Sequence, residues 1–79
     1  MDKNYFLAKS RMNALAMRGD DVEAGTLRRL EKITQPEKLV GLYVAAQERD
    51  LKKVVKAVAS KYKDLTDMSI KSALPKDGV

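Results

Sequence analysis

The chain contains neither cysteine nor histidine, which leaves a protein of 79 residues with few ways to become stable. Domains of this size bury only about 60% of the surface of the unfolded chain, so many rely on disulfides, bound metals, well-packed helices or a partner subunit. Without cysteine and histidine, disulfides, thiolate zinc sites, thiol nucleophiles and histidine acid–base relays are excluded. We therefore expect a non-enzymatic protein without cofactor or metal, stabilised by helix packing.

Apolar residues recur at the three- and four-residue spacing of a helix face in four successive segments. The predicted helices span residues 2–18, 20–33, about 35–63 and 68–74. We therefore predict an all-α fold, a small bundle of three to four helices with one long third helix. A single helical domain would cover residues 1–75, followed by a frayed tail over residues 76–79.

Glycine and acidic residues mark the boundary between the first two predicted helices. Gly19 is placed just past the end of the first helix, where glycine commonly ends a helix. Asp20 and Glu23 have the spacing of a capping box at the start of the second. Gly25 inside that helix costs about 1 kcal/mol relative to alanine. It either permits close helix packing, or the helix begins only near Thr26.

The predicted third helix has the clearest start. Thr34 is suited to cap it, Pro36 lies in its first turn, and Glu37 follows three residues after the threonine. The stripe of this segment, apolar except for one glutamine, comprises Val40, Val44, Gln47, Leu51, Val55, Val58 and Tyr62. Because the stripe crosses residues 48–50 in register, we expect one continuous helix rather than a helix-turn-helix.

The length of this helix raises the question of a second copy. A helix over residues 37–63 would be about 40 Å long, whereas a compact chain of this size has a diameter of about 30 Å. The helix must either bend near residues 48–50, where three charged residues are adjacent, or extend against a partner. We favour a homodimer, because the apolar residues from Leu51 to Leu65 alternate four- and three-residue steps as a coiled-coil seam does. The predicted protein interface comprises Leu51, Val55, Val58, Tyr62 and Leu65, with Phe6 of the first helix as a further exposed contact.

Positive charge is concentrated in one part of the chain. The formal net charge is +5, and residues 49–63 hold six cations against Asp50 as their single acid. On a helix most of these cations lie opposite the apolar stripe. The predicted nucleic-acid-binding residues are Arg49, Lys52, Lys53, Lys56 and Lys63, supported by Arg28, Arg29 and Lys32. Lysine predominates within residues 49–63, which suits contact with phosphates better than readout of bases. A helix face that only keeps the protein soluble has the same pattern.

Two functions are compatible with these features. The first is a small regulatory protein that contacts the nucleic-acid backbone, or a nucleic-acid complex, through a basic helix face. The second is an adaptor or inhibitor that docks on a larger protein, or an acidic protein partner, through a helical face. No stretch approaches the roughly 18 apolar residues of a membrane span, and the N-terminus lacks a signal sequence. We therefore expect a cytoplasmic protein without a membrane partner.

One short stretch resembles a known family. It is the octet Leu42-Tyr43-Val44-Ala45-Ala46-Gln47-Glu48-Arg49. The octet is similar to the aromatic-Tyr-x-Ala-Ala-x-x-Arg stretch of the haemolysin-expression-modulating family, which are small helical nucleoid co-regulators. The resemblance implies a small helical protein that binds a nucleoid-structuring partner. It is confined to this octet, and the spacing between the first two helices differs from the family's, so no site residue is assigned from it.

Overall fold

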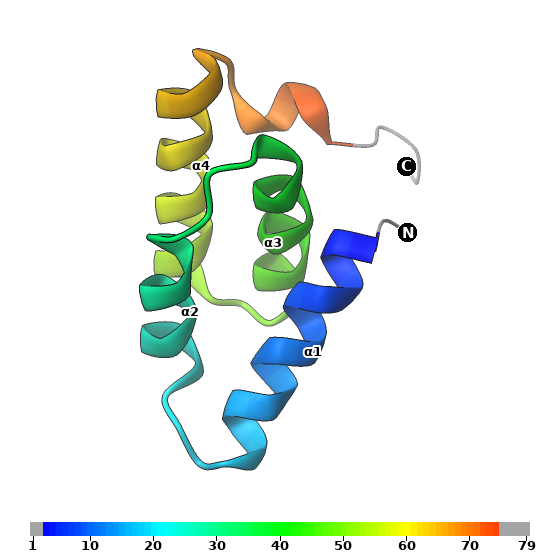
Figure 1. Cartoon of the computed structure of the whole chain (residues 1–79), viewed down its shortest axis with the longest axis vertical. Coiled ribbons are helices and arrows are strands. Elements are labelled where there is room, and N and C mark those ends of the chain that lie inside the picture. Colours follow the sequence, from blue (N-terminus) through cyan, green and yellow to red (C-terminus); the bar gives the residue numbers. More distant parts are fainter. Residues whose placement is uncertain (1–2, 75–79) are drawn as a thin grey trace.

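Four α-helices and a short 3-10 helix make up the part of the chain that the computed structural model describes, residues 3–74 (Figure 1). The elements are α1 (Lys3–Met17), α2 (Val22–Leu30), α3 (Pro36–Glu48), α4 (Lys52–Thr66) and the 3-10 helix η1 (Ile70–Ala73). In Figure 1, α3 lies between α4 and α1, and α2 packs against both α1 and α4. The prediction of a small all-α bundle is confirmed.

Helix α1 ends at a glycine, as the sequence predicts. Gly19 has a φ of 79°, in the left-handed region that glycine adopts without steric cost. Its N–H donates to the carbonyl of Ala16 at 3.0 Å. The N–H of Asp20 donates to the carbonyl of Leu15, also at 3.0 Å. These are the two hydrogen bonds of a Schellman motif, so the chain leaves the helix here and turns toward α2.

The N-caps of α2 and α3 lie one residue after the predicted positions. Asp21 caps α2, and its carboxylate accepts a hydrogen bond from the N–H of Ala24 at 3.2 Å, so the prediction of Asp20 as the cap is wrong. Gln35 precedes α3 and makes no side-chain cap hydrogen bond, so Thr34 is not the cap either. The helix nevertheless begins at the predicted proline, whose fixed φ suits a first helical position.

Two glycines allow helices to approach closely. Gly25 lies inside α2, so the alternative start near Thr26 is wrong, and a Cβ at Gly25 would lie 2.9 Å from Cδ1 of Leu15 in α1. Gly41 lies in the middle of α3, where a Cβ would come within 2.6 Å of the backbone nitrogen of Tyr5. At that crossing the backbones of α1 and α3 are in near contact.

The predicted long helix is two helices, α3 and α4, so the prediction of one continuous helix over residues 35–63 is wrong. Asp50, in the turn between them, has a left-handed φ of 60°. Its N–H donates to the carbonyl of Gln47 at 3.1 Å. The N–H of Leu51 donates to the carbonyl of Ala46 at 3.0 Å, which completes the same Schellman motif that ends α1. Aspartate tolerates the left-handed region better than most residues do, so no glycine is needed at the break.

Because residues 35–63 form two helices, no long helix extends beyond the domain in the way that suggested a homodimer. Helix α4 has 15 residues and is therefore about 22 Å long. The longest extent of the protein is 35 Å, so the helix fits within its own domain. The apolar faces of α3 and α4 pack against each other within one chain. The homodimer stays a prediction, but the length of the helix no longer supports it.

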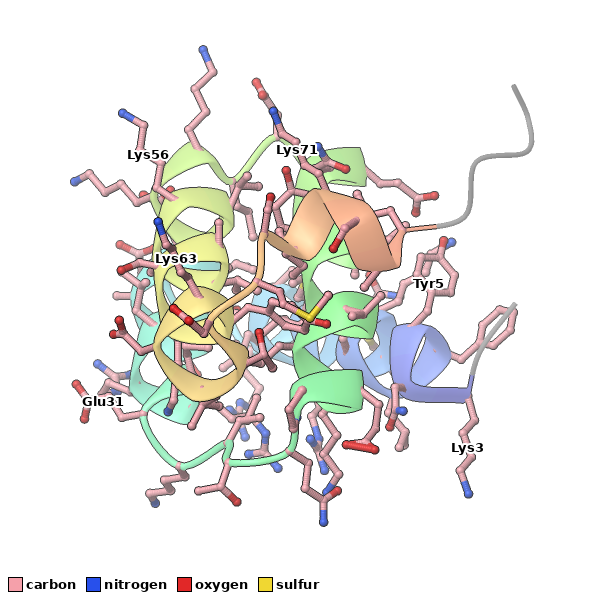
Figure 2. All side chains as sticks on the ribbon, turned by 90° about the horizontal axis from the view of Figure 1, so that it is seen from above. Lys3, Tyr5, Glu31, Lys56, Lys63 and Lys71 are labelled. Atoms are coloured by element: carbon pink, nitrogen blue, oxygen red, sulfur yellow. The ribbon has the colours of Figure 1, made fainter. Side chains whose placement is uncertain are left out.

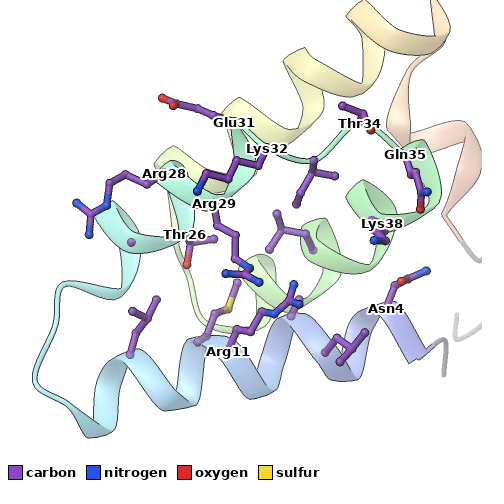
Figure 3. Close-up of a pocket in the computed structure, with 17 residues that line it drawn as sticks. Asn4, Arg11, Thr26, Arg28, Arg29, Glu31, Lys32, Thr34, Gln35 and Lys38 are labelled. Carbon is purple, nitrogen blue, oxygen red and sulfur yellow. The ribbon is translucent and has the colours of Figure 1, made fainter.

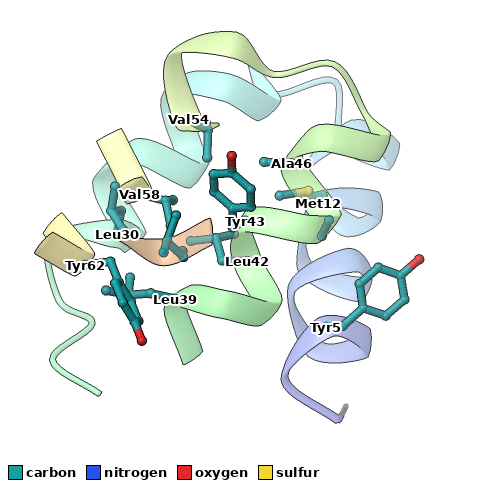
Figure 4. Packing of buried hydrophobic residues seen from close by; sticks show 12 residues of the cluster. Tyr5, Met12, Leu30, Leu39, Leu42, Tyr43, Ala46, Val54, Val58 and Tyr62 are labelled. Atoms are coloured by element: carbon teal, nitrogen blue, oxygen red, sulfur yellow. The ribbon is translucent and has the colours of Figure 1, made fainter. Parts of the chain in front are cut away.

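The core forms around α3, which is buried on more of its surface than the other helices (Figure 4). Its members are Tyr5, Met12, Leu30, Leu39, Leu42, Tyr43, Ala45, Ala46, Val54, Val58, Tyr62 and Ile70. Val58 and Tyr62 have only 0% and 7% of their surface exposed. The prediction that these two residues form a seam with another chain is therefore wrong, because they belong to the core of their own domain.

The C-terminal segment covers one end of the core. Helix α4 is followed by Asp67, which has a left-handed φ of 62°. The predicted α-helix over residues 68–74 is instead the 3-10 helix η1, capped by the hydroxyl of Ser69. Ile70 is 2% exposed, and this burial attaches η1 to the bundle. The predicted start at residue 2, the domain limit at residue 75 and the tail over residues 76–79 lie outside the described residues.

Candidate functional site

Four lysines of α4 form what we call the α4 lysine row: Lys52, Lys53, Lys56 and Lys63. All four are exposed, and Figure 2 shows Lys56 pointing away from the bundle. Within residues 3–74 the one ion pair joins Arg18 to Asp20. No lysine of the row therefore forms an ion pair among these residues, although Asp50 lines a shallow hollow together with Lys52 and Lys56.

Two members of the row lie where a helix least favours positive charge. Lys52 and Lys53 are the first two residues of α4, at the positive end of the helix dipole. The N-cap, Leu51, supplies no side-chain hydrogen bond. The carboxylate of Glu23 in α2 accepts a hydrogen bond from the N–H of Lys53 at 3.3 Å, so Glu23 acts here and not in the predicted capping box. Helix stability alone favours acidic residues at such positions by about 0.3–1 kcal/mol each.

Two other cations of residues 49–63 make contacts within the fold. Arg49 lies after the end of α3, and its Nη1 donates to Oδ1 of Asn13 in α1 at 2.9 Å. Lys61 Nζ donates to the carbonyl oxygens of Leu30 and Glu31, at 2.6 and 3.1 Å, and so caps the end of α2. Arg49 was predicted to bind nucleic acid with the lysines, but the structure directs it to α1.

A second positively charged surface is a groove of about 750 Å³ between α1, α2 and the start of α3, which we call the basic groove. Five of its lining residues are cations, and Glu31 is the single acid among them. The cations are Arg11 of α1, Arg28 and Arg29 of α2, Lys32 after α2, and Lys38 of α3. No α4 residue of the described chain lines this groove, so the groove and the α4 lysine row are formed by different residues.

Figure 3 shows the orientation of these charged side chains. Arg11 and Arg29 reach into the groove from α1 and α2. Arg28 and Glu31 lie at its margin and point away from it. The interior of the groove therefore holds two guanidinium groups and no carboxylate from the described residues.

Aliphatic side chains contribute to the floor of the basic groove, beside polar lining residues such as Thr26. Leu7 of α1 lines it and remains 48% exposed. Leu15 and Ile33 line it as partly buried residues, above Met12 and Leu42 of the core. An anion that enters between the arginines would therefore meet apolar surface beneath them.

Sequence reasoning found three cations of the groove and missed two. Arg28, Arg29 and Lys32 are close in sequence and were predicted together. Arg11 and Lys38 were not assigned a role, because they lie on two other helices. Helical periodicity reports which residues share a face of one helix, and it carries no information on how separate helices pack.

The remaining predicted protein-interface residues do not form a continuous surface stripe. Phe6 is 55% exposed near the start of α1, and Leu65 is 44% exposed near the end of α4. Leu51 and Val55 are partly buried against the core. Phe6 and Leu65 are therefore separate exposed positions, and the predicted residues do not form a seam.

A polar contact joins α1 to the end of α3. The hydroxyl of Tyr5 donates to a carboxylate oxygen of Glu48, and Lys9 Nζ lies 5.7 Å from the centroid of the Tyr5 ring. The hydrogen bond to Glu48, together with desolvation, raises the pKa of the Tyr5 hydroxyl, and Lys9 partly opposes this. Because α1 forms one wall of the basic groove, this contact helps to fix the shape of the groove.

Comparison of the chain with protein-family models, with curated proteins and with solved structures gave no match. The resemblance of residues 42–49 therefore has no wider alignment behind it, and the burial of Tyr43, Ala45 and Ala46 explains these three positions by packing. In the described part of the chain no helix is long and apolar enough to cross a bilayer. No group of three or more acidic side chains that could hold a metal ion occurs there either. The two basic surfaces are the features of the described residues that indicate a ligand.

Proposed function

We propose that the protein binds the backbone of a nucleic acid, or of a nucleic-acid complex, through the α4 lysine row. The observation that carries this proposal is the positive charge at the start of α4. Lys52 and Lys53 oppose the helix dipole there, and no side chain within residues 3–74 forms an ion pair with them. A bound phosphate would be attracted by the lysines, whereas the N–H of Lys53 at the helix N-terminus already donates to the Glu23 carboxylate.

The composition of the row favours phosphate contact over base readout. Each lysine presents a compact charge on a flexible chain, whereas base recognition relies on the rigid fork of arginine or on amide side chains. Lys52 and Lys63 are separated by about 16 Å along the helix axis, a length over which duplex DNA presents several phosphates. We infer binding that does not depend on base sequence and that gains its affinity from counterion release.

Fluorescence anisotropy with a labelled duplex of about 30 base pairs tests this proposal through its dependence on salt. If the four lysines of the row contact phosphates, log K should fall with log salt at a slope of about −3.6. Affinity should then decrease on the order of 100-fold between about 50 and 200 mM salt. A slope near zero would exclude phosphate contact as the source of affinity.

A charge-reversal variant locates the contact on α4. Lys52→Glu/Lys56→Glu should weaken duplex binding about 30-fold, from two lost contacts and two repulsive charges worth about 2 kcal/mol together. The variant should stay folded, because an acid in the first turn suits the helix dipole. The matched control Lys3→Glu/Lys71→Glu makes the same charge change at exposed lysines of α1 and η1. Equal losses in the two variants would mean that net charge alone attracts the duplex.

A further inference from the structure

We propose that the basic groove binds an acidic amphipathic helix of a partner protein. Carboxylates of that helix would lie between Arg11 and Arg29, and its apolar side chains would cover the aliphatic floor. This is a second binding surface, and it does not rest on the proposed nucleic-acid contact, because no described α4 residue lines the groove.

The charges of the groove select an anionic ligand. Arg11 and Arg29 enter it from two different helices, and neither forms an ion pair within residues 3–74. Glu31, the single acid of the lining, points away from both (Figure 3). Two guanidinium groups that face one hollow repel each other until an anion lies between them. Each can hold a carboxylate through two parallel N–H···O bonds, which a lysine cannot do.

The floor selects a ligand that also carries aliphatic side chains. Leu7 keeps 48% of its surface exposed, and Leu15 and Ile33 are only partly covered. Apolar surface gains free energy in proportion to the area that a ligand removes from water. A small free anion would pair with the arginines and leave this floor wet, whereas leucine-like side chains on the same ligand would cover it.

A nucleic acid matches the groove less well than a peptide does. No aromatic residue lines it among those described, so unpaired bases would find no ring on which to stack. Phosphates and sugars gain little from contact with leucine and isoleucine. The α4 lysine row, by contrast, offers phosphate contacts along an exposed helix face.

The surroundings of the groove favour a helical occupant over an extended one. Its walls are α1, α2 and the start of α3, and residues 3–74 contain no strand to whose edge an extended peptide could pair. An amphipathic helix presents apolar side chains along one stripe and can carry carboxylates on both sides of it. That arrangement matches an aliphatic floor flanked by cations, as in other complexes where a helix lies in a groove.

A designed peptide of about 18 residues, or five helical turns, provides the probe. It carries leucine along one helical stripe, glutamate on both flanks and a fluorescein label, and its binding to the full chain is followed by fluorescence polarisation. We expect a dissociation constant below about 100 μM. Arg11→Glu/Arg29→Glu should weaken binding at least about tenfold, and Leu7→Asn, which keeps the charge, at least about threefold. Lys52→Glu/Lys56→Glu makes the same charge change outside the groove and should leave the affinity within about twofold.

Three results would overturn the proposal. The first is equal binding of a peptide with the same composition whose leucines are spread around the helix. The second is an equal loss of affinity in the groove variant and in Lys52→Glu/Lys56→Glu. The third is displacement of the peptide by a single-stranded oligonucleotide whose own binding depends on Arg11 and Arg29, which would assign the groove to nucleic acid. Circular dichroism checks folding, and Arg11→Gln/Arg29→Gln replaces the groove variant if that variant does not fold.

Discussion

The α4 lysine row and the basic groove are both positively charged, but the chain builds them in different ways. The row lies along a single helix, consists of lysines and faces solvent. The groove needs three helices to form, and it places Arg11 and Arg29 above an aliphatic floor. A net charge of +5 therefore does not specify one ligand. What lies beneath and beside the charge determines whether a phosphate backbone or an acidic helix fits it.

The largest expected effect is a separation of the two binding activities. Lys52→Glu/Lys56→Glu should lower duplex affinity about 30-fold and peptide affinity less than about twofold. Arg11→Glu/Arg29→Glu should lower peptide affinity at least about tenfold and duplex affinity less than about twofold. The titrations are made at about 0.15 M salt, where the Debye length of about 8 Å limits the influence of one surface on the other. If both ligands lose affinity equally in each variant, the two surfaces act as one electrostatic site and the distinction between them fails.

A substitution at Gly41 should affect the groove more than the row. A Cβ there would meet the backbone nitrogen of Tyr5 at 2.6 Å, and backbone atoms cannot move aside as a side chain can. Gly41→Ala should therefore displace α1 and lower the free energy of unfolding by about 2 kcal/mol. Because α1 is a wall of the groove and makes no part of the row, the peptide should lose affinity while the folded protein still binds duplex.

The matched control for this substitution is Gly25→Ala. Its Cβ would meet the flexible end of Leu15 at 2.9 Å, and the gain in helix propensity of up to about 1 kcal/mol offsets part of that contact. Urea denaturation should thus show a much smaller loss than for Gly41→Ala. Similar losses for the two variants would contradict the argument from backbone contact.

Two helix ends show how much of the fold the sequence predicts. Helices α1 and α3 end in the same Schellman motif, with Gly19 and Asp50 as the respective left-handed residues. Gly19 marks its turn because glycine favours that conformation, so the end of α1 was predicted. Asp50 gives no such signal, because aspartate occurs in many conformations. The apolar stripe continues in register across the break, so periodicity alone predicted one helix where the structure has two.

The two basic surfaces differ in the same respect. The α4 lysine row was predicted because its members share a face of one helix, and their spacing in sequence reports that face directly. The basic groove was predicted only through its α2 cluster. Arg11 and Lys38 join it through the packing of α1 and α3, which depends on contacts such as Gly41 against Tyr5 and not on local spacing.

Alkaline pH should loosen the wall of the groove. Because the carboxylate of Glu48 accepts its proton, the pKa of Tyr5 in the folded protein lies above the ordinary value of 10.0. As pH rises through this value the unfolded chain loses the proton first, so the free energy of unfolding should decrease with rising pH. In Tyr5→Phe this part of the decrease should disappear. Identical slopes for the two proteins, measured by urea denaturation from about pH 8 to 11, would exclude the contact as its cause.

The smallest expected effect distinguishes binding surfaces from faces that only keep the protein soluble. Lys52→Glu places an acid at the start of α4 and should raise the free energy of unfolding by about 0.3–1 kcal/mol at low salt. Arg11→Glu places a carboxylate across the groove from Arg29 and should gain about 0.2–1 kcal/mol. Lys71→Glu, at an exposed position of η1, should change stability by less than about 0.5 kcal/mol.

Both gains should fade as salt is added, because they are electrostatic. If replacing a cation by glutamate stabilises the folded protein and also weakens ligand binding, the native cation destabilises the fold. If neither Lys52→Glu nor Arg11→Glu is more stable than the Lys71→Glu control, the native positive charges do not destabilise the fold. The positive charges of both surfaces would then not be positioned for an anion, and solubility would suffice to explain them.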